Sequence, residues 1–468
     1  MKLKKNHRRE IFQGLIVFFL ILVTIVAATQ IKTIKDFFSE AAYNPANFYV
    51  DAQAMIGNMP RPWRNLAQGG EDHAWRLQPI TSQVAALQPE YIRLDHIYDF
   101  YDVVTGSPGN LSLDFSKLDL VLNDIRAVGA TPFISLSYMP PAISKGDIVD
   151  RPVNYSDWQY LTQKTIEHIS GRLGFENVYY EVWNEPDLFG SWKYYGEKNY
   201  LNLYAASARG AVQAKNTKSF KLGGPATTGL YENWVKALMK FATENQLKLD
   251  FISWHRYTND LDQYKRDMVN VRGWTTEFPK YNGTIEFLIT EWGHDSNNNT
   301  GYDSRYGAAH TVAAAINLVG TVERAFVFEI QDGSDPNKQN HWGRWGLFTA
   351  QTGGSQAKPR YTGLKMLDSL ANQRIQVMGQ GSMIKGLAAK TDSGNIQIVL
   401  ANFDPRGTNQ EAVPITYQNI TPGKYLLKTK YLSGKNATVQ VATDAAELRA
   451  TIPMAANEVA FVELSPQP

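Results

Sequence analysis

Two segments of the sequence each place a glutamate where an apolar, β-type run ends. The run Tyr179–Asp187 finishes in an Asn-Glu-Pro turn, which would present Glu185 at the tip of a strand. The run Phe287–Gly293 would present Glu291 in the same manner. Retaining glycoside hydrolysis requires two carboxyl groups, one as proton donor and the other as nucleophile. We therefore take Glu185 and Glu291 as candidate catalytic residues.

The two glutamates need a scaffold that brings distant strand ends together. From about Phe48 onward, β-type runs alternate with amphipathic helical stretches. Eight strand–helix repeats favour an α/β fold, a (β/α)8 TIM barrel within residues 31–370. A doubly wound open sheet is the alternative, but no Gly-rich phosphate-binding turn follows the first strand. The expected strands are Phe48–Met55, Tyr91–Asp95, Thr131–Ser137, Val178–Trp183, Lys221–Pro225, Phe251–His255, Glu286–Thr290 and Arg324–Ile330, and the expected helices are Lys117–Val128, Trp158–Leu173, Tyr200–Lys215, Trp234–Asn245 and Tyr306–Leu318.

The pattern changes after Leu370. Helical periodicity ends there, and β-type runs recur between turn signals such as Pro422-Gly423. Residues 371–468 are therefore expected to form a C-terminal antiparallel β-sandwich without catalytic residues. Its expected strands are Ser382–Ala388, Ile396–Phe403, Tyr425–Leu432 and Glu458–Leu464.

Residues 1–30 have the composition of a targeting segment. A basic cluster in Met1–Glu10 precedes an apolar run, Ile11–Ala28, whose length is at the short end of a membrane span. The basic flank favours a cytoplasmic N-terminus with the rest of the chain exported. We expect either an N-terminal transmembrane helix that anchors an extracytoplasmic catalytic domain, or a cleaved signal segment that leaves a secreted protein.

Composition excludes several classes of function. The net charge of +2 comes without an extended basic stripe in the globular part, so no nucleic-acid partner is expected. The absence of cysteine excludes disulfides, thiol catalysis and Cys-based metal sites. The sequence contains no indication of an oligomeric state.

One loop has the spacing of a calcium-binding loop, with oxygen-bearing side chains at Asp295, Asn297, Asn299 and Asp303. Thr300, however, occupies the position of the turn glycine, and Tyr306 that of the bidentate glutamate. We therefore expect neither a metal nor an organic cofactor.

The motifs around both glutamates resemble the signature of clan A glycoside hydrolases, Trp183–Pro186 on the fourth strand and Thr290–Gly293 on the seventh. Within the clan, the sequence is most similar to family 39, the β-xylosidase and α-L-iduronidase group. That similarity rests on Asp250–Tyr257 and Tyr91–Asp95, and the resemblance covers about residues 48–370. It implies a barrel with a trailing β-domain that hydrolyses a carbohydrate.

Each catalytic role also has a physical argument. Glu185 would be the general acid/base, because burial and the second carboxylate raise its pKa. Glu291 would be the nucleophile, which must stay ionised and needs donors around it. Arg93 is a candidate donor, although a structural ion pair with Asp95 or Asp99 is the alternative.

Three further residues are candidates for substrate binding. Asn184 would direct its amide toward the 2-position of the sugar. Tyr257 could donate its hydroxyl to Glu291, and His255 lies two residues earlier on the same face of the strand. Structural packing is the alternative for both His255 and Tyr257.

Other side chains could line a sugar-binding cleft. Trp292, Trp342 and Trp345 are candidates for the floors of sugar subsites, with core packing as the alternative. Glu329, at the tip of the eighth strand, is a rival carboxylate that could bind substrate. The long first loop, Gly57–Pro79, carries Trp63 and Trp75, while Asp95, His96 and Asp99 follow the second strand.

The sequence therefore predicts a retaining glycoside hydrolase that cleaves an extracellular xylan-type or secreted polysaccharide or oligosaccharide. One alternative is another clan A endo-glycanase, of glucanase or mannanase type, with a long cleft lined by Trp63, Trp75 and Trp345. The other is a catalytically silent carbohydrate-binding surface protein, against which the intact Glu185 and Glu291 argue. Sugar identity, linkage, anomeric configuration and endo or exo action are left open.

Overall fold

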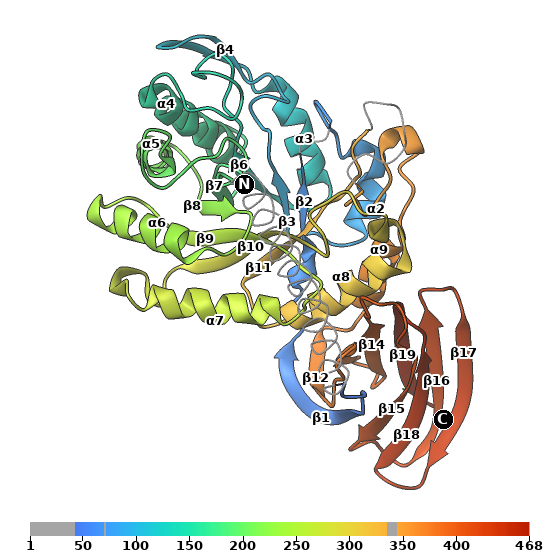
Figure 1. Cartoon of the computed structure of the whole chain (residues 1–468). Helices are drawn as coiled ribbons and strands as arrows, with labels where there is room; N and C mark the ends of the chain where they lie inside the picture. Colours follow the sequence, from blue (N-terminus) through green and yellow to red (C-terminus); the bar gives the residue numbers. More distant parts are fainter. Residues whose placement is uncertain (1–42, 70–71, 335–343, 468) are drawn as a thin grey trace, which may run out of the picture.

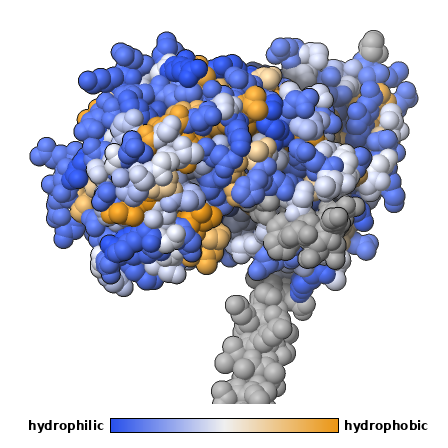
Figure 2. Space-filling model, turned by 90° about the horizontal axis from the view of Figure 1, so that it is seen from above, coloured by the Kyte–Doolittle hydropathy of each residue, from blue (hydrophilic) through white to orange (hydrophobic). Residues whose placement is uncertain are grey.

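The computed structural model describes residues 43–69, 72–334 and 344–467 of the chain. The predicted N-terminal segment, residues 1–30, lies outside the described residues. Within the described ranges, no helix is long and apolar enough to cross a membrane. Figure 2 shows a mostly hydrophilic surface on which apolar side chains are exposed in separate patches.

Eight parallel strands close into a barrel, in the order β10-β11-β2-β3-β6-β7-β8-β9 (Figure 1). This confirms the predicted barrel, and because the ring is closed the doubly wound open sheet is excluded. The strands are β2 (Asn65–Gln68), β3 (Tyr91–Leu94), β6 (Thr131–Leu136), β7 (Val178–Val182), β8 (Phe220–Thr227), β9 (Phe251–Tyr257), β10 (Glu286–Gly293) and β11 (Arg324–Phe328).

Amphipathic helices surround the barrel and bury an apolar stripe against it. In α6, for example, Trp234, Leu238 and Ala242 recur at intervals of four residues and are all buried. The helices of the described part are α2 (Thr81–Ala85), α3 (Ser116–Ala127), α4 (Tyr155–Ile166), α5 (Tyr200–Gln213), α6 (Glu232–Glu244), α7 (Gln263–Thr275), α8 (Arg305–Leu318) and α9 (Pro359–Asp368).

The interior of the barrel is filled by apolar and aromatic side chains. One cluster contains Tyr91, Phe133, Tyr179, Phe251 and Leu288, each from a different strand. The rings of Phe133 and Tyr179 stack with their centroids 5.4 Å apart. This plug closes the barrel, so that substrate can approach only from the loops at the carboxyl ends of the strands.

The second domain is one continuous nine-stranded sheet, in the order β17-β16-β19-β14-β13-β12-β1-β15-β18. Its pairs are antiparallel except for β1 with β15, and side chains from both halves share a single hydrophobic core. The sheet therefore curls around its own core, as a β-sandwich does. The strands are β1 (Phe48–Asn58), β12 (Gln373–Met378), β13 (Ile384–Lys390), β14 (Ile396–Asn402), β15 (Glu411–Gln418), β16 (Gly423–Tyr431), β17 (Asn436–Thr443), β18 (Glu447–Met454) and β19 (Glu458–Pro466).

The prediction that Phe48–Met55 is the first barrel strand was wrong. This segment is part of β1, which pairs with β12 and β15 beside the barrel (Figure 1). Phe48, Val50 and Ala52 alternate inward into the core of the second sheet. The first barrel strand is instead β2, whose four buried residues lie inside the segment that we expected to be a loop.

Four strands of the second sheet, β12, β15, β17 and β18, were not predicted. In β17 most side chains are exposed, so the strand lacks the alternation of buried and exposed positions on which a sequence-based assignment depends. A short hairpin after β3, made of β4 (Val104–Ser107) and β5 (Asn110–Leu113), was also missed. Helix α8 is buried almost throughout because it lies between the barrel and strands β13, β14 and β19.

Candidate active site

A buried arginine joins three elements at the carboxyl end of the barrel. Arg93, on β3, is completely buried. Its Nε donates to Glu181 Oε2 at 2.8 Å, its Nη1 to Glu291 Oε1 at 2.8 Å, and its Nη2 to Asn184 Oδ1 at 2.7 Å. Its ion-pair partners are thus Glu181 and Glu291, and not Asp95 or Asp99 as in the alternative from the sequence.

A register shift in β10 directs Glu291 into the barrel. Ile289 pairs with Trp254 on β9 and Glu291 pairs with His255, so the pairing skips Thr290. Leu288 belongs to the interior plug and Ile289 to the outer core, so strict alternation would turn Glu291 outward. The skipped residue reverses the phase of the strand, as a β-bulge does, and places Glu291 above the plug.

Glu185 comes from a tight turn after β7. Its φ of 44° is left-handed, a conformation that non-glycine residues adopt at an energetic cost and that is common at functional sites. Its backbone N–H donates to the carbonyl of Ala226 at the end of β8, at 2.9 Å. Trp183, also left-handed with a φ of 72°, is buried outside the barrel against Trp158 and Trp192. These contacts hold the turn, and with it the Glu185 carboxyl group.

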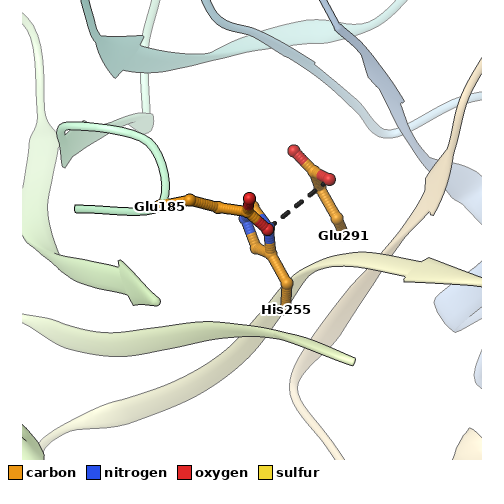
Figure 3. Close-up of side chains that lie close together, drawn as sticks. All are labelled: Glu185, His255 and Glu291. Atoms are coloured by element: carbon orange, nitrogen blue, oxygen red, sulfur yellow. Dashed lines mark hydrogen bonds and ion pairs between the residues drawn. The ribbon is translucent and has the colours of Figure 1, made fainter. Parts of the chain in front are cut away.

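His255 joins the two glutamates. Its Nδ1 lies 2.7 Å from Glu185 Oε1, in a hydrogen bond, and 3.4 Å from Glu291 Oε2. Figure 3 shows the two carboxyl groups converging on the imidazole ring from different elements. One oxygen of each carboxyl group and a ring nitrogen of His255 lie within 4.8 Å of one another. Glu291 Oε2, the oxygen nearer to His255, also accepts a hydrogen bond from the Tyr257 hydroxyl at 2.8 Å.

Burial and charge set the ionisation of this group. Burial, reinforced by the charge of Asp187, raises the pKa of Glu185 to about 8. Burial also raises the pKa of Glu291 to about 7, while His255 and Arg93 act to lower it. Burial lowers the pKa of His255, while the charge of Glu291 acts to raise it. The two carboxyl groups are therefore unequal, and Glu185 holds its proton to higher pH.

Asn184 is held by two hydrogen bonds. Its Oδ1 accepts from Arg93, and its Nδ2 donates to the Tyr138 hydroxyl at 2.8 Å. A side-chain amide has two N–H donors, so one remains to face a ligand.

A cavity of about 550 Å³ opens above these groups. Its wall includes Tyr138, Asn184, Glu185, Tyr257 and Glu291. Arg93 and His255 are buried beneath them and support the wall. Six residues predicted as site residues, namely Glu185, Glu291, Asn184, Arg93, His255 and Tyr257, are thus brought together by the barrel.

The aromatic predictions had mixed outcomes. Trp345 lines the cavity, as expected of a sugar-binding side chain. Trp292 does not, because it follows Glu291 in β10 and points outward, where it is fully buried against Tyr264 and His310. Trp63 and Trp75 are also buried, with their indole N–H groups bonded to Asp368 and Gln331. Trp342 lies outside the described residues.

Glu329 does not line the cavity. It is fully buried after β11, where its Oε2 accepts hydrogen bonds from Gln68 Nε2 at 3.2 Å and the Gly69 backbone N–H at 3.3 Å. These bonds hold the loop after β2, whose Gly69 lines the cavity, and a contact between Glu329 and substrate stays a prediction.

Sequence analysis missed Glu181 and Tyr138. Glu181 lies between Tyr180 and Val182 in a buried strand, and a charge at such a position requires a buried partner, which here is Arg93. That requirement was a usable signal. Tyr138 follows β6 by two residues, and positions just beyond barrel strands often belong to the site.

Two groups of side chains among the described residues have the donor atoms that a metal site needs. In the calcium-like loop, Asp295 accepts hydrogen bonds from Asn297 and Asn299, so the loop is closed by its own side chains. Glu185, His255 and Glu291 are close enough to share a cation. Both oxygens of Glu291 already accept hydrogen bonds, however, and the adjacent charge of Arg93 disfavours a second cation.

A closed parallel barrel with two facing glutamates, at the carboxyl ends of its fourth and seventh strands, is the arrangement found in glycoside hydrolases of clan A. The model of glycosyl hydrolases family 39 matches residues 50–419. The chain belongs to this family.

Two curated relatives are bacterial β-xylosidases. The chain is 32% identical to that of Geobacillus stearothermophilus over 157 residues, 31% of each chain. It is 28% identical to that of Caldicellulosiruptor saccharolyticus over 298 residues, 58% of this chain and 59% of the relative. The matched segments thus span less than two thirds of either relative.

Solved structures share the fold over most of their length. The family 39 enzyme of Xanthomonas axonopodis pv. citri gives a TM-score of 0.73 at 20% identity, covering 92% of this chain and 99% of that one. A monomeric β-xylosidase from Caulobacter crescentus also gives 0.73, at 21% identity, covering 90% and 100%.

Proposed function

We propose that this protein is a retaining glycosidase that hydrolyses xylo-type glycosides by double displacement. The observation that carries the proposal is the distance of less than 4.8 Å between oxygens of Glu185 and Glu291. Retaining enzymes hold their carboxyl groups about 5–5.5 Å apart, whereas inverting enzymes leave about 6.5–9.5 Å for a water molecule. The short separation supports direct attack of a carboxylate on the sugar.

In the first step, Glu291 attacks the anomeric carbon and Glu185 protonates the departing glycosidic oxygen. The hydrogen bonds from Arg93 and Tyr257 orient Glu291 and favour its ionised form. The higher pKa of Glu185 suits a proton donor. In the second step, Glu185 takes a proton from water, and the hydroxide displaces the sugar from Glu291.

Asn184 contributes to the same transition state. Asn184 lines the cavity, and its remaining N–H donor can bond the 2-hydroxyl group of the sugar, where hydrogen bonds strengthen as the reaction proceeds. The bonds to Arg93 and Tyr138 fix the amide in advance, so little side-chain entropy is lost on binding.

The names of the curated relatives, both β-xylosidases, support a xylo-type substrate. Burial of Trp63 and Trp75 removes two of the three tryptophans expected along an endo-acting cleft. We therefore favour short xylo-oligosaccharides over long polysaccharides as substrates.

We also propose that the enzyme works outside the cytoplasm, tethered by or released from the segment 1–30. The support is the basic cluster followed by the apolar run Ile11–Ala28. Fractionation of the producing cells would test this, with the protein expected in the membrane or the medium. Recovery of the intact chain in the cytosol would contradict it.

The covalent step can be tested by trapping. A 2-deoxy-2-fluoro-β-xyloside with a good leaving group should inactivate the enzyme and add one fluorosugar to the peptide containing Glu291. The fluorine slows both the formation and the hydrolysis of the glycosyl-enzyme, and the good leaving group restores only the rate of formation, so the intermediate accumulates. Mass spectrometry of the digested protein identifies the labelled residue. Glu291→Gln should lower kcat by about 10⁴-fold or more and prevent labelling, whereas labelling of Glu185 or Glu329 would refute the assignment.

The pH dependence follows from the two raised pKa values. Activity requires ionised Glu291 and protonated Glu185, so kcat/KM should rise as Glu291 loses its proton and fall as Glu185 loses its own. A bell-shaped profile with its maximum between about 7 and about 8 is expected. The limbs report the coupled pair rather than isolated groups.

The variant Glu185→Gln tests which glutamate controls each limb of the pH profile of kcat/KM. With a dinitrophenyl xyloside, whose leaving group needs no proton, this variant should keep the acidic limb and lose the alkaline one. An unchanged alkaline limb would show that another group controls it.

A further inference from the structure

A third carboxyl group faces the cavity, and the mechanism above does not use it. Asp95 directly follows β3, two residues after Arg93, and only 7% of its surface is exposed. It lines the cavity together with Glu185 and Glu291. Burial raises its pKa.

Asp95 has an unsatisfied acceptor. Its Oδ1 is buried and has no hydrogen-bond partner among the described residues. Of its charged neighbours in sequence, Arg93 donates its hydrogen bonds to Glu181, Glu291 and Asn184, and His96 Nδ1 bonds Asp99 at 2.7 Å. Both act on Asp95 through their charge and lower its pKa. Buried polar groups are nearly always hydrogen-bonded, so an exception at a ligand cavity points to the ligand.

The charge of the cavity wall limits the class of ligand that can bind there. Its described lining residues include three carboxyl groups, those of Asp95, Glu185 and Glu291, and neither lysine nor arginine. A sugar hydroxyl would supply the missing donor to Asp95. The carboxylate of a uronic acid would instead add a like charge at a site of low dielectric.

We propose that Asp95 determines sugar specificity by accepting hydrogen bonds from ring hydroxyl groups of a neutral sugar and disfavouring uronic acids. The assignment rests on the proposed glycosidase function. Asp95 binds the sugar, whereas Glu185 is the acid and Glu291 the nucleophile.

The test is a comparison of substrates that lack single hydroxyl groups. kcat/KM is measured for wild type and Asp95→Ala on nitrophenyl β-xyloside and on its deoxy analogues at C3 and C4. Asp95→Ala should lower kcat/KM on the parent about 10- to 100-fold, the range for a hydrogen bond to a charged group. On the analogue that lacks the bound hydroxyl, wild type and Asp95→Ala should have nearly the same kcat/KM, because the interaction is already absent.

Two other variants complete the experiment. Asp102→Asn removes a negative charge from the same stretch after β3, at an exposed residue that pairs with Lys117, and should leave the rates unchanged. Asp95→Asn keeps the size of the side chain and serves in the same comparison if Asp95→Ala does not fold. It should also reduce, about tenfold, the preference for xylose over glucuronic acid as a competitive inhibitor.

The outcomes are distinguishable. If Asp95→Ala and Asp95→Asn each lower the rates on the parent and every deoxy analogue by one common factor, Asp95 has only a structural role and the proposal is overturned. Unchanged rates overturn it as well. If the wild-type enzyme cleaves no glycoside in the series, the proposed function fails, and the assignment of Asp95 fails with it.

Discussion

The active site depends on one buried cation, the guanidinium group of Arg93. It has no exposed surface and donates hydrogen bonds in three directions, to Glu181 on β7, to Glu291 on β10 and to Asn184 beyond β7. Removing a charge from water is costly unless it is paired and hydrogen-bonded. The barrel meets this requirement because its closure brings β3, β7 and β10 into one ring. Arg93 in turn holds Glu291 and Asn184 where a sugar would react.

The two glutamates reach their positions through local departures from regular backbone geometry. The skipped residue Thr290 reverses the phase of β10, so that Glu291 faces inward and Trp292 outward. A left-handed turn at Glu185 brings the second carboxyl group from outside the strand. Such exceptions are expected where the placement of functional groups takes precedence over regular structure. Beneath them, the aromatic plug makes a rigid floor, and His255 connects the pair.

The sequence predicted the barrel and the six residues that gather at its carboxyl end, because strand–helix alternation and strand-end motifs are local signals. It could not assign β1, since Phe48, Val50 and Ala52 show the same alternation in either sheet and only long-range pairing decides between them. The outward direction of Trp292 depends on the register shift between Ile289 and Glu291, which no local sequence pattern predicts. A buried ion pair at Glu181 could have been predicted, because a charged residue in an apolar strand requires a partner of opposite charge.

The central claim is that Glu185 and Glu291 act as an acid and a nucleophile at short range. The most direct test is the stereochemistry of the first product. Hydrolysis of an aryl β-xyloside is followed by proton NMR before mutarotation equilibrates the anomers. The account predicts that β-xylose appears first and the α anomer later, since two displacements retain configuration. Initial release of α-xylose would mean a single displacement by water and would contradict the proposed role of Glu291.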